Sequence, residues 1–333
     1  MAGDDEELMR RAIEMAASVR ATTSPNPWVG CVIATVDGAT FEGATQPPGG
    51  PHAEIVALAA AGERARRATL YSTLEPCAHH GRTPPCTDAI IAAGVSRVVV
   101  GVADPDPLVA GRGTAALRRA GVKVELGLCA EEVSVQLQPY LKHRTTGRPW
   151  VVLKLAVSLD GRTAAPDGTS RWITGEAART DAHRLRAESD AVLVGAGTVR
   201  ADDPSLTVRA VGGPDPQRVV LGSAPDDARI RPAWEVSGDL GDVLDDLGQR
   251  GVMQLLVEGG AGVAHGFHAA GLVDRYVFYL APVLFGGDDG RPLFAGPGAP
   301  TIDEVWRGRI VDVTPLGGDL RVELATAGEP AGR

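Results

Sequence analysis

One histidine and two cysteines in the first third of the chain have the spacing of metal ligands. His52 begins a His-Ala-Glu segment, Cys77 follows a proline, and Cys86 comes after eight intervening residues. An imidazole and two thiolates, without a fourth ligand nearby in the sequence, describe an open tetrahedral zinc site. Zinc would lower the pKa of water in the vacant position to about 7, so the site would supply hydroxide at neutral pH.

Glu54 lies two residues after the histidine, at the expected start of a helix. It would not bind the metal but would take a proton from the water and pass it to a leaving amine, a role worth roughly 10² to 10⁴ in rate. This arrangement is the signature of zinc nucleobase deaminases, which usually have two residues between the cysteines. The longer spacing here places an extra loop beside the metal. We do not expect its His79 and His80 to be ligands, because a fourth protein ligand would close the site.

These side chains need a scaffold, and the first half of the chain alternates helical and extended patterns. Apolar spacing and turn residues predict helices at 6–19, 53–61, 87–93 and 113–120, and strands at 28–34, 40–44, 68–73, 97–102 and 123–126. Helices of this length between strands predict a three-layer α/β/α domain. A basic segment, 140–149, precedes a new apolar strand, so we place the domain boundary between residues 147 and 148.

The second half repeats the alternation without copying the first. The predicted strands are 150–156, 191–195, 218–221, 254–257 and 274–280, with a helix near 262–270. The strand at 254–257 ends in glycines that lead into this helix, where backbone N–H groups and the helix dipole can bind a phosphate. A second such turn occurs at 195–198. The pattern is not the dinucleotide fingerprint Gly-x-Gly-x-x-Gly, so a plain tight turn remains the alternative.

Longer motifs around these residues resemble the bifunctional riboflavin-biosynthesis deaminase/reductase family. In the first half they are the runs 23–30, 51–54 and 75–86, and in the second half the runs 154–162, 170–175, 181–186, 197–209 and 257–260. The resemblance implies a cytidine-deaminase-like α/β/α domain over 1–147 and a dihydrofolate-reductase-like α/β domain over 148–325, followed by a flexible tail, 326–333. It also implies zinc-dependent hydrolytic deamination of a diamino-pyrimidinone ribosylamine phosphate, then NADPH-dependent reduction of its ribosyl group to a ribityl chain.

The resemblance also implies roles for individual residues. One zinc per chain would be held by His52, Cys77 and Cys86, with Glu54 as the proton shuttle. The residues that match deaminase substrate contacts are Asn26, Arg82 and Asp104. The residues that match NADPH contacts are Ala156, Trp172, Thr198, Asp202, Ser223, Gly260 and Gly262. The residues that match reductase substrate contacts are Ser170, Arg186, Leu206, Arg209 and Glu258. Among these, Arg186, Arg209 and Ser170 would clamp a 5′-phosphate and so position the sugar carbon.

The chain departs from the family pattern at three places. Thr45 stands where many members have histidine, and Asp106 stands where they have asparagine, both at positions expected near the deaminase substrate. Only 34 residues separate Ser223 from Glu258, where the family usually has a longer stretch with an additional strand and helix. We therefore expect the adenosine side of the NADPH site to be trimmed. The other two cysteines, Cys31 and Cys129, lie in apolar contexts and are expected in the core.

Composition narrows the functional class. The net charge is −9 and both halves are acidic, which argues against a nucleic-acid partner. No apolar run approaches the ~20 residues of a membrane span, and the four cysteines and the acidic first segment favour a cytoplasmic protein. We expect a small-molecule substrate and a homo-oligomer. Three alternatives stay open: a deaminase whose second half is a scaffold without a cofactor, a nucleic-acid-editing deaminase, and a purely structural zinc.

Overall fold

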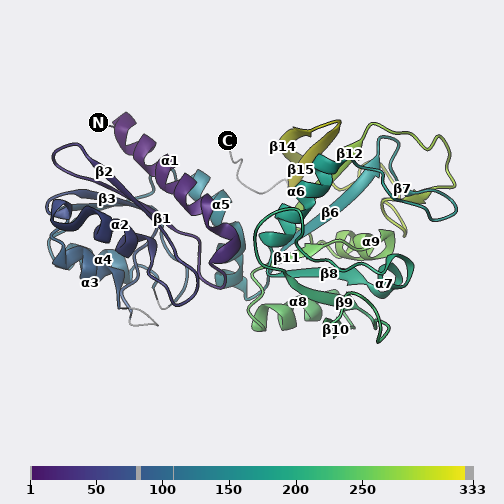
Figure 1. The fold of residues 1–333 in the computed structure, drawn as a ribbon, viewed down its shortest axis with the longest axis horizontal. Helices are drawn as coiled ribbons and strands as arrows, with labels where there is room; N and C mark the ends of the chain where they lie inside the picture. Colours follow the sequence, from purple (N-terminus) through teal and green to yellow (C-terminus); the bar gives the residue numbers. More distant parts are fainter. Residues whose placement is uncertain (1, 80–83, 108, 327–333) are drawn as a thin grey trace. The chain divides into compact units, whose positions relative to one another are not determined.

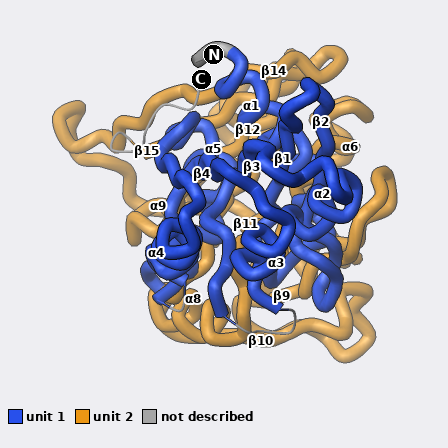
Figure 2. The backbone as a smooth tube through the Cα atoms, turned by 90° about the vertical axis from the view of Figure 1, so that its left-hand side faces the viewer, with its two compact units in different colours: residues 1–146, 332–333 blue, residues 147–331 orange. Residues whose placement is uncertain are grey.

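The computed structural model describes residues 2–79, 84–107 and 109–326 (Figure 1). Its chain divides into two compact units, one ending at Thr146 and the other beginning at Gly147, which Figure 2 shows in different colours. The flexible tail expected at 326–333 lies, from residue 327 on, outside the described residues. Each unit has its own sheet and its own core.

The first unit contains a five-stranded sheet in the order β2-β1-β3-β4-β5. β1 pairs antiparallel with β2 and β3, whereas β3, β4 and β5 run parallel. The strands are β1 (Gly30–Ala34), β2 (Thr40–Ala44), β3 (Thr69–Leu74), β4 (Arg97–Val102) and β5 (Lys123–Leu126). All five coincide closely with the predicted strands.

Helices cover both faces of this sheet. They are α1 (Ala2–Ser18), α2 (Ala53–Ala61), α3 (Cys86–Ala92), α4 (Arg112–Arg119) and α5 (Ala130–Thr146), with the 3₁₀ turns η1 (Arg20–Thr22) and η2 (Gly62–Ala65). α1 and α5 pack on one face, and α2, α3 and α4 pack on the other (Figure 1). The predicted three-layer α/β/α architecture is confirmed.

Two expectations for this unit need correction. The sequence analysis did not predict α5, which contains Pro139, a residue that normally interrupts a helix. Cys129 lies at the edge of the core rather than inside it: it is half-buried in the turn before α5, packs against the core cluster and has a φ of +52°. Its apolar neighbours suggested a strand, but the chain has already left the sheet at Leu126. Cys31, in contrast, is fully buried in β1 as predicted.

The second unit contains an eight-stranded sheet in the order β10-β9-β8-β11-β6-β12-β15-β14. The strands from β10 to β12 are parallel, and β15 and β14 complete the sheet antiparallel. They are β6 (Trp150–Ser158), β8 (Ala191–Gly195), β9 (Gln217–Leu221), β10 (Trp234–Val236), β11 (Gln254–Val257), β12 (Arg275–Ala281), β14 (Gly308–Leu316) and β15 (Asp319–Thr326). A separate ribbon pairs β7 (Arg162–Ala164) with β13 (Arg291–Pro292).

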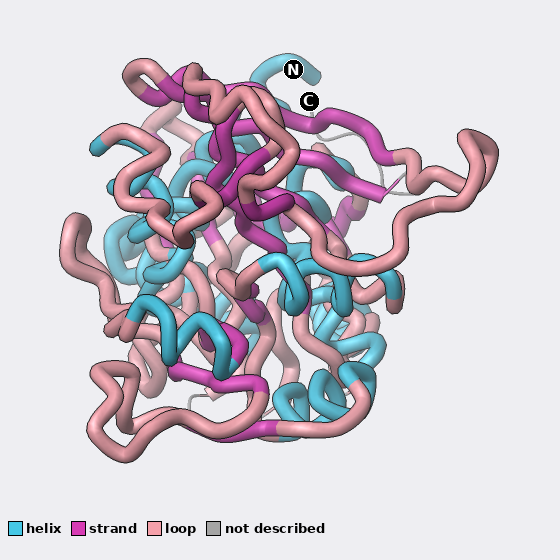
Figure 3. Tube along the Cα trace, turned by 90° about the vertical axis from the view of Figure 1, so that its right-hand side faces the viewer, coloured by secondary structure: helices cyan, strands magenta, loops and turns pink. Residues whose placement is uncertain are grey.

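Two cores lie on the two faces of this sheet; Figure 3 colours its strands magenta and the helices cyan. Alternate residues of β6 divide between them: Trp150 and Val152 pack on one face, and Val151 and Leu153 on the other. The four helices are α6 (Glu176–Ala187), α7 (Ala196–Asp202), α8 (Leu240–Gln249) and α9 (Ala261–Ala269). α6 and α7 contribute to the first core and α8 and α9 to the second, as expected for a parallel sheet covered on both faces.

The shortened segment between Ser223 and Glu258 still holds a strand, β10, and a helix, α8, before β11. In the described part of the chain, no helix has both the length and the apolar character needed to cross a membrane.

Candidate functional site

The three predicted metal ligands come together in the first unit. His52 caps the N-terminus of α2, Cys77 lies in the loop after β3, and Cys86 is the first residue of α3. Nδ1 of His52 lies 3.6 Å from the Cys77 Sγ and 3.3 Å from the Cys86 Sγ. The three ligand atoms all lie within 4.8 Å of one another. Within the described ranges, no other group of three or more His, Cys, Asp or Glu side chains forms such a candidate metal site.

The distances fit a tetrahedral zinc. Bonds of about 2.05 Å to nitrogen and 2.3 Å to sulfur at tetrahedral angles separate the N and S atoms by roughly 3.6 Å. Hydrogen bonds from Cys86 and His52 lower the pKa of the Cys77 thiol, and the same pairing, together with burial, raises that of Cys86, so Cys77 is the readier thiolate of the two. The backbone N–H of Cys86 also points at the Cys77 Sγ, at 3.4 Å. His79 is not part of the group, and His80 lies outside the described residues.

Glu54 lies in the first turn of α2 and is only 4% exposed. Burial raises the pKa of its carboxyl, and the nearby Cys77 thiolate raises it further. A carboxyl whose pKa is raised in this way holds a proton more readily than an exposed one, as suits a general acid and base.

Gly43 of β2 allows α2 to pack closely on the sheet, and this packing places His52 and Glu54 beside the two cysteines. A Cβ atom on Gly43 of β2 would lie 2.3 Å from the Ala53 carbonyl oxygen and 2.6 Å from the Ala57 nitrogen. No other residue type permits so close an approach of the sheet and the helix.

The residues predicted to contact the deaminase substrate are more scattered. Asn26 is half-buried in the loop before β1, and Arg82 lies outside the described residues. Asp104 is buried, and its carboxylate accepts hydrogen bonds from the Tyr140 hydroxyl at 3.0 Å and the Asp106 N–H at 2.9 Å. Burial raises the pKa of Asp104. Thr45, at the family's histidine position, bonds to the backbone N–H and carbonyl of Val29, just before β1.

Sequence reasoning missed the role of Glu75. Its buried carboxylate accepts hydrogen bonds from the backbone N–H groups of Gly111, at 3.0 Å, and Thr114, at 2.9 Å. These bonds tie the loop that carries Cys77 to the first turn of α4. Glu75 stands in the quoted motif 75–86, but only its burial shows this function.

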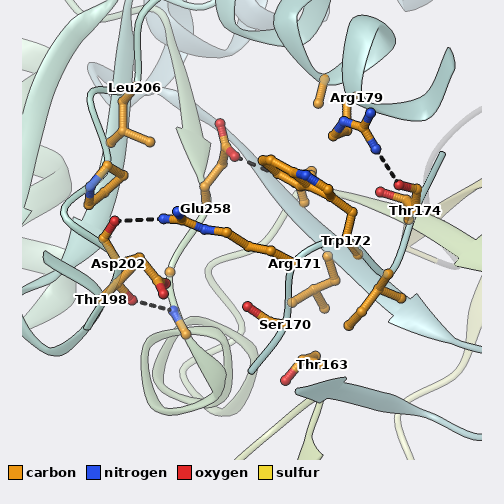
Figure 4. Close-up of a pocket in the computed structure, with 18 of the residues that line it drawn as sticks. Thr163, Ser170, Arg171, Trp172, Thr174, Arg179, Thr198, Asp202, Leu206 and Glu258 are labelled. Carbon is orange, nitrogen blue, oxygen red and sulfur yellow. Dashed lines mark hydrogen bonds and ion pairs between the residues drawn. The ribbon is translucent and has the colours of Figure 1, made fainter. Parts of the chain in front are cut away.

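The second unit contains a cavity of about 920 Å³. Most of the residues that the sequence assigned to the reductase line it, namely Ala156, Ser170, Trp172, Arg186, Thr198, Asp202, Leu206, Arg209, Glu258, Gly260 and Gly262 (Figure 4). Ser223 does not: it is exposed beyond the end of β9 and bonds to Glu235. The glycine turn is joined to α7, because the Gly260 N–H donates to the Thr198 hydroxyl at 3.2 Å.

A buried ionic group forms one wall of this cavity. Glu258 accepts two hydrogen bonds from Arg186, at 2.5 and 2.9 Å, and lies 3.5 Å from the Lys154 Nζ. Burial opposes the ionisation of Glu258, but the positive charges of Arg186 and Lys154 outweigh it and hold the pKa at about 2. Arg186 therefore grips a carboxylate rather than standing free for a phosphate.

Other arginines of the cavity wall pair with no carboxylate among the residues described. Arg171 donates to the Asp202 carbonyl at 2.9 Å and Arg179 to the Thr174 carbonyl at 2.6 Å (Figure 4). Arg209 donates to the Thr207 hydroxyl at 2.8 Å. Arg229 and Arg291 also line the cavity. Of these five arginines, Arg209 alone was predicted from the sequence to contact a ligand. Guanidinium groups without acidic partners favour phosphorylated ligands.

The fold and the two sites define a two-unit α/β protein in which a deaminase-type metal site precedes a reductase-type cavity. The family model of the cytidine and deoxycytidylate deaminase zinc-binding region matches residues 2–102, and that of the RibD C-terminal domain matches residues 149–322. The riboflavin biosynthesis protein RibD of Escherichia coli is 40% identical over 97% of this chain and all of its own length. The chain belongs to the RibD family.

Further relatives support the assignment to this family. The Mycobacterium tuberculosis RibD is 43% identical, with 96% of each chain covered. The solved structure of Acinetobacter baumannii RibD has a TM-score of 0.92 at 40% identity, covering 98% of this chain and 99% of its own. That of a Thermotoga maritima diaminohydroxyphosphoribosylaminopyrimidine deaminase/5-amino-6-(5-phosphoribosylamino)uracil reductase has a TM-score of 0.89 at 33% identity, covering 98% and 99%.

Proposed function

We propose that this chain catalyses two consecutive steps of riboflavin biosynthesis. The first unit deaminates 2,5-diamino-6-ribosylamino-4(3H)-pyrimidinone 5′-phosphate, and the second reduces the ribosyl group of the product to a ribityl chain. Its cofactors are zinc and NADPH. The observation that carries the proposal is the meeting of an imidazole, two thiolates and a buried carboxyl in one unit of a chain whose other unit holds an arginine-rich cavity.

In the deaminase unit, His52, Cys77 and Cys86 hold the metal. Zinc, when bound, supplies the Lewis acidity that activates water at neutral pH. Glu54 accepts the proton from that water and returns it to the departing nitrogen, so that one water is consumed and one ammonia is released. Its burial keeps bulk water from taking over the transfer. Asn26, Arg82 and Asp104 are proposed to orient the substrate.

In the reductase unit, the residues of the cavity wall bind and orient two phosphorylated ligands. NADPH, when bound, supplies the two electrons that reduce C1′ of the ribosyl group. Thr198, Gly260 and Gly262 are proposed to hold its phosphates, with Ala156, Trp172 and Asp202 along its length. Ser223 would contact the adenosine end, beyond the cavity wall. The volume of about 920 Å³ is at the large end of ligand pockets, as two such ligands require.

The pyrimidine substrate would lie beside Ser170, Leu206 and Arg209. Arg186 and Glu258 contribute to this side as a rigid pair, since each satisfies the other's charge. Fixing the phosphate end of the substrate positions C1′ for reduction.

Mass spectrometry of the products from the diamino substrate tests both steps. Without NADPH we expect only the deaminated ribosylamine, and with NADPH the ribityl product. Treatment with a zinc chelator should abolish deamination while leaving reduction of the pre-deaminated compound intact. A chain that deaminates but neither reduces nor binds millimolar NADPH would support the scaffold alternative.

We further propose that the protein is cytoplasmic and forms homo-oligomers. All four cysteines are free, which suits a reducing compartment. β14 is an edge strand that exposes Ile310 and Val313, a combination that proteins usually cover. Light scattering coupled to size-exclusion chromatography would measure the mass of the assembly. A monomer at micromolar concentration would contradict the proposal that the protein forms homo-oligomers.

A further inference from the structure

Helix α6 presents a row of three side chains to the reductase cavity. Arg179, His183 and Arg186 follow one another at spacings of four and three residues, which places them on one face of the helix. The neighbouring Ala182 and Leu185 are buried in the core, so the orientation of this face is fixed. Arg186 grips Glu258, and Arg179 packs against Trp172. No role for His183 was predicted from the sequence.

Residues 205–209 form a loop at the cavity wall with an unfavourable backbone. Leu206 has a φ of +51°, a left-handed conformation that bulky residues adopt only when surrounding contacts impose it. Its side chain is buried in the core. Arg209 folds back over the loop and donates to the hydroxyls of Ser205 and Thr207. One guanidinium and two hydroxyls are thus gathered within five residues, a set suited to a phosphate.

α6 holds the backbone of this loop at two points. Nδ1 of His183 accepts a hydrogen bond from the Arg209 N–H at 3.2 Å, and Arg186 donates to the Thr207 carbonyl at 3.4 Å. Arg186 already makes two shorter bonds to Glu258, so the bond from Arg209 to His183 is the more direct link between helix and loop.

The accepting nitrogen must carry no proton. Burial lowers the pKa of His183, and the positive charges of Arg186 and Arg209 lower it further, while Glu258 and a hydrogen bond with the Thr207 backbone act in the opposite direction without reversing the shift. The imidazole is therefore neutral at pH 7 and free to accept the Arg209 N–H.

We propose that His183 is a positioning residue of the reductase site: Nδ1 of its imidazole fixes the Arg209 backbone, and with it the direction in which the loop 205–209 presents its donors to a phosphate. The inference rests on the proposed function, because that phosphate belongs to the pyrimidine or to NADPH. The position of Arg209 and Ser205 on the side proposed for the pyrimidine favours the pyrimidine phosphate.

Two substitutions of His183 distinguish the role of its Nδ1 from that of its Nε2. Asparagine can place an acceptor near the position of Nδ1, whereas glutamine places its polar group near Nε2 and leaves the Arg209 N–H without a partner. For His183→Gln we expect KM for the deaminated pyrimidine phosphate to rise about five- to tenfold, as for the loss of one hydrogen bond, with kcat within threefold. His183→Asn should stay within twofold of wild type. KM for NADPH should not change in either variant.

A binding measurement without NADPH gives a second readout. Stabilisation of the full-length protein against heat by the pyrimidine phosphate should be reduced in His183→Gln and retained in His183→Asn. The unchanged KM for NADPH is the internal control for folding of the second unit, and deaminase activity of the same chain should be unchanged in both variants.

The pH dependence provides a third arm. Below the pKa of His183 the protonated imidazole cannot accept the Arg209 N–H, so KM of the wild type should rise from pH 7 to pH 5. The phosphate of the substrate also titrates there, and His183→Asn, which lacks the imidazole, measures that part alone. The rise should therefore be larger in the wild type than in His183→Asn.

Three outcomes would overturn the proposal. Wild-type KM and thermal stabilisation in His183→Gln would show that the bond is dispensable. Equal impairment of the two variants would mean that Nε2 acts, by contacting a ligand directly. A change confined to KM for NADPH would assign the loop to the dinucleotide phosphate instead. If the wild-type protein itself neither binds nor reduces the pyrimidine, the proposed function fails rather than this inference.

Discussion

Each unit has a buried glutamate at its site, Glu54 in the first and Glu258 in the second, and these two are in opposite electrostatic states. Glu54 in the deaminase unit has a thiolate as a close neighbour, and burial raises its pKa. The Glu258 side chain in the reductase unit is also largely buried, but Arg186 and Lys154 lower its pKa to about 2. A buried carboxyl with a raised pKa can exchange a proton, whereas a buried carboxylate between two cations stays ionised and holds them in place. The same residue type thus does chemistry in one site and builds the wall of the other.

The largest effect we expect is on the proton-exchanging glutamate. Glu54→Gln keeps the size of the side chain but cannot exchange the proton, so deamination should fall by roughly 10² to 10⁴. Zinc content, measured by elemental analysis, and reduction of the pre-deaminated substrate should stay at the wild-type level. Deamination within tenfold of wild type, with zinc retained, would show that Glu54 is not the shuttle.

The corresponding substitution in the second unit, Glu258→Gln, should lower the unfolding free energy of that unit. It leaves Arg186 and Lys154 without a charge partner in a buried site, which costs about 3 kcal/mol of unfolding free energy. Urea unfolding of the second unit would measure this cost. Glu304→Gln, which changes an exposed glutamate of the same unit, serves as the control. A variant as stable as that control would remove the distinction between the two glutamates.

The pH dependence sharpens the same contrast. Glu258 has a folded-state pKa of about 2, below its ordinary value of 4.5, so its contribution to stability is complete above pH 4.5 and is lost as the pH falls toward 2. The wild-type second unit should lose stability over this window. Glu258→Gln should lose less, and parallel curves for the two proteins would argue against the assigned cause.

A smaller effect should follow from crowding the helix that carries Glu54. Gly43→Ala would force α2 away from β2, lowering the unfolding free energy by about 1 to 3 kcal/mol and weakening zinc retention. Gly212→Ala is the matched control, because nothing lies within 4 Å of its added Cβ. Equal melting temperatures for the two variants would show that the close approach is not needed.

The smallest effect should be at the open rim of the reductase cavity. Trp172 is 70% exposed, and the Arg179 guanidinium lies 4.7 Å from the centre of its ring. Such a contact at an exposed site is worth about 0.5 to 1 kcal/mol, so Arg179→Gln should raise KM for NADPH about two- to fivefold. Arg200→Gln, an exposed arginine of α7 outside the cavity wall, should leave KM unchanged. A loss as large as that of Glu54→Gln would mean that Arg179 contacts the reacting groups.

The sequence by itself predicted the proposed metal ligands and determined most of the strands. His52, Cys77 and Cys86 could be found because each follows or opens a short motif whose spacing is local, and because thiolates beside an imidazole have few other uses. The strands followed from alternating apolar residues and from the turns between them. The glycine-rich turn at 258–262 was visible for the same reason.

Only the tertiary structure decided how the charged residues are used. Arg186 and Glu258 are 72 positions apart, and the sequence assigned Arg186 to a phosphate because nothing local reveals its partner. The burial of Asp104 under Tyr140 and the bond from Arg209 to His183 were hidden in the same way. Charge is a property of the residue, but its desolvation and its neighbours depend on which distant segments pack against it, and these decide whether it binds a ligand, moves a proton or holds the fold together.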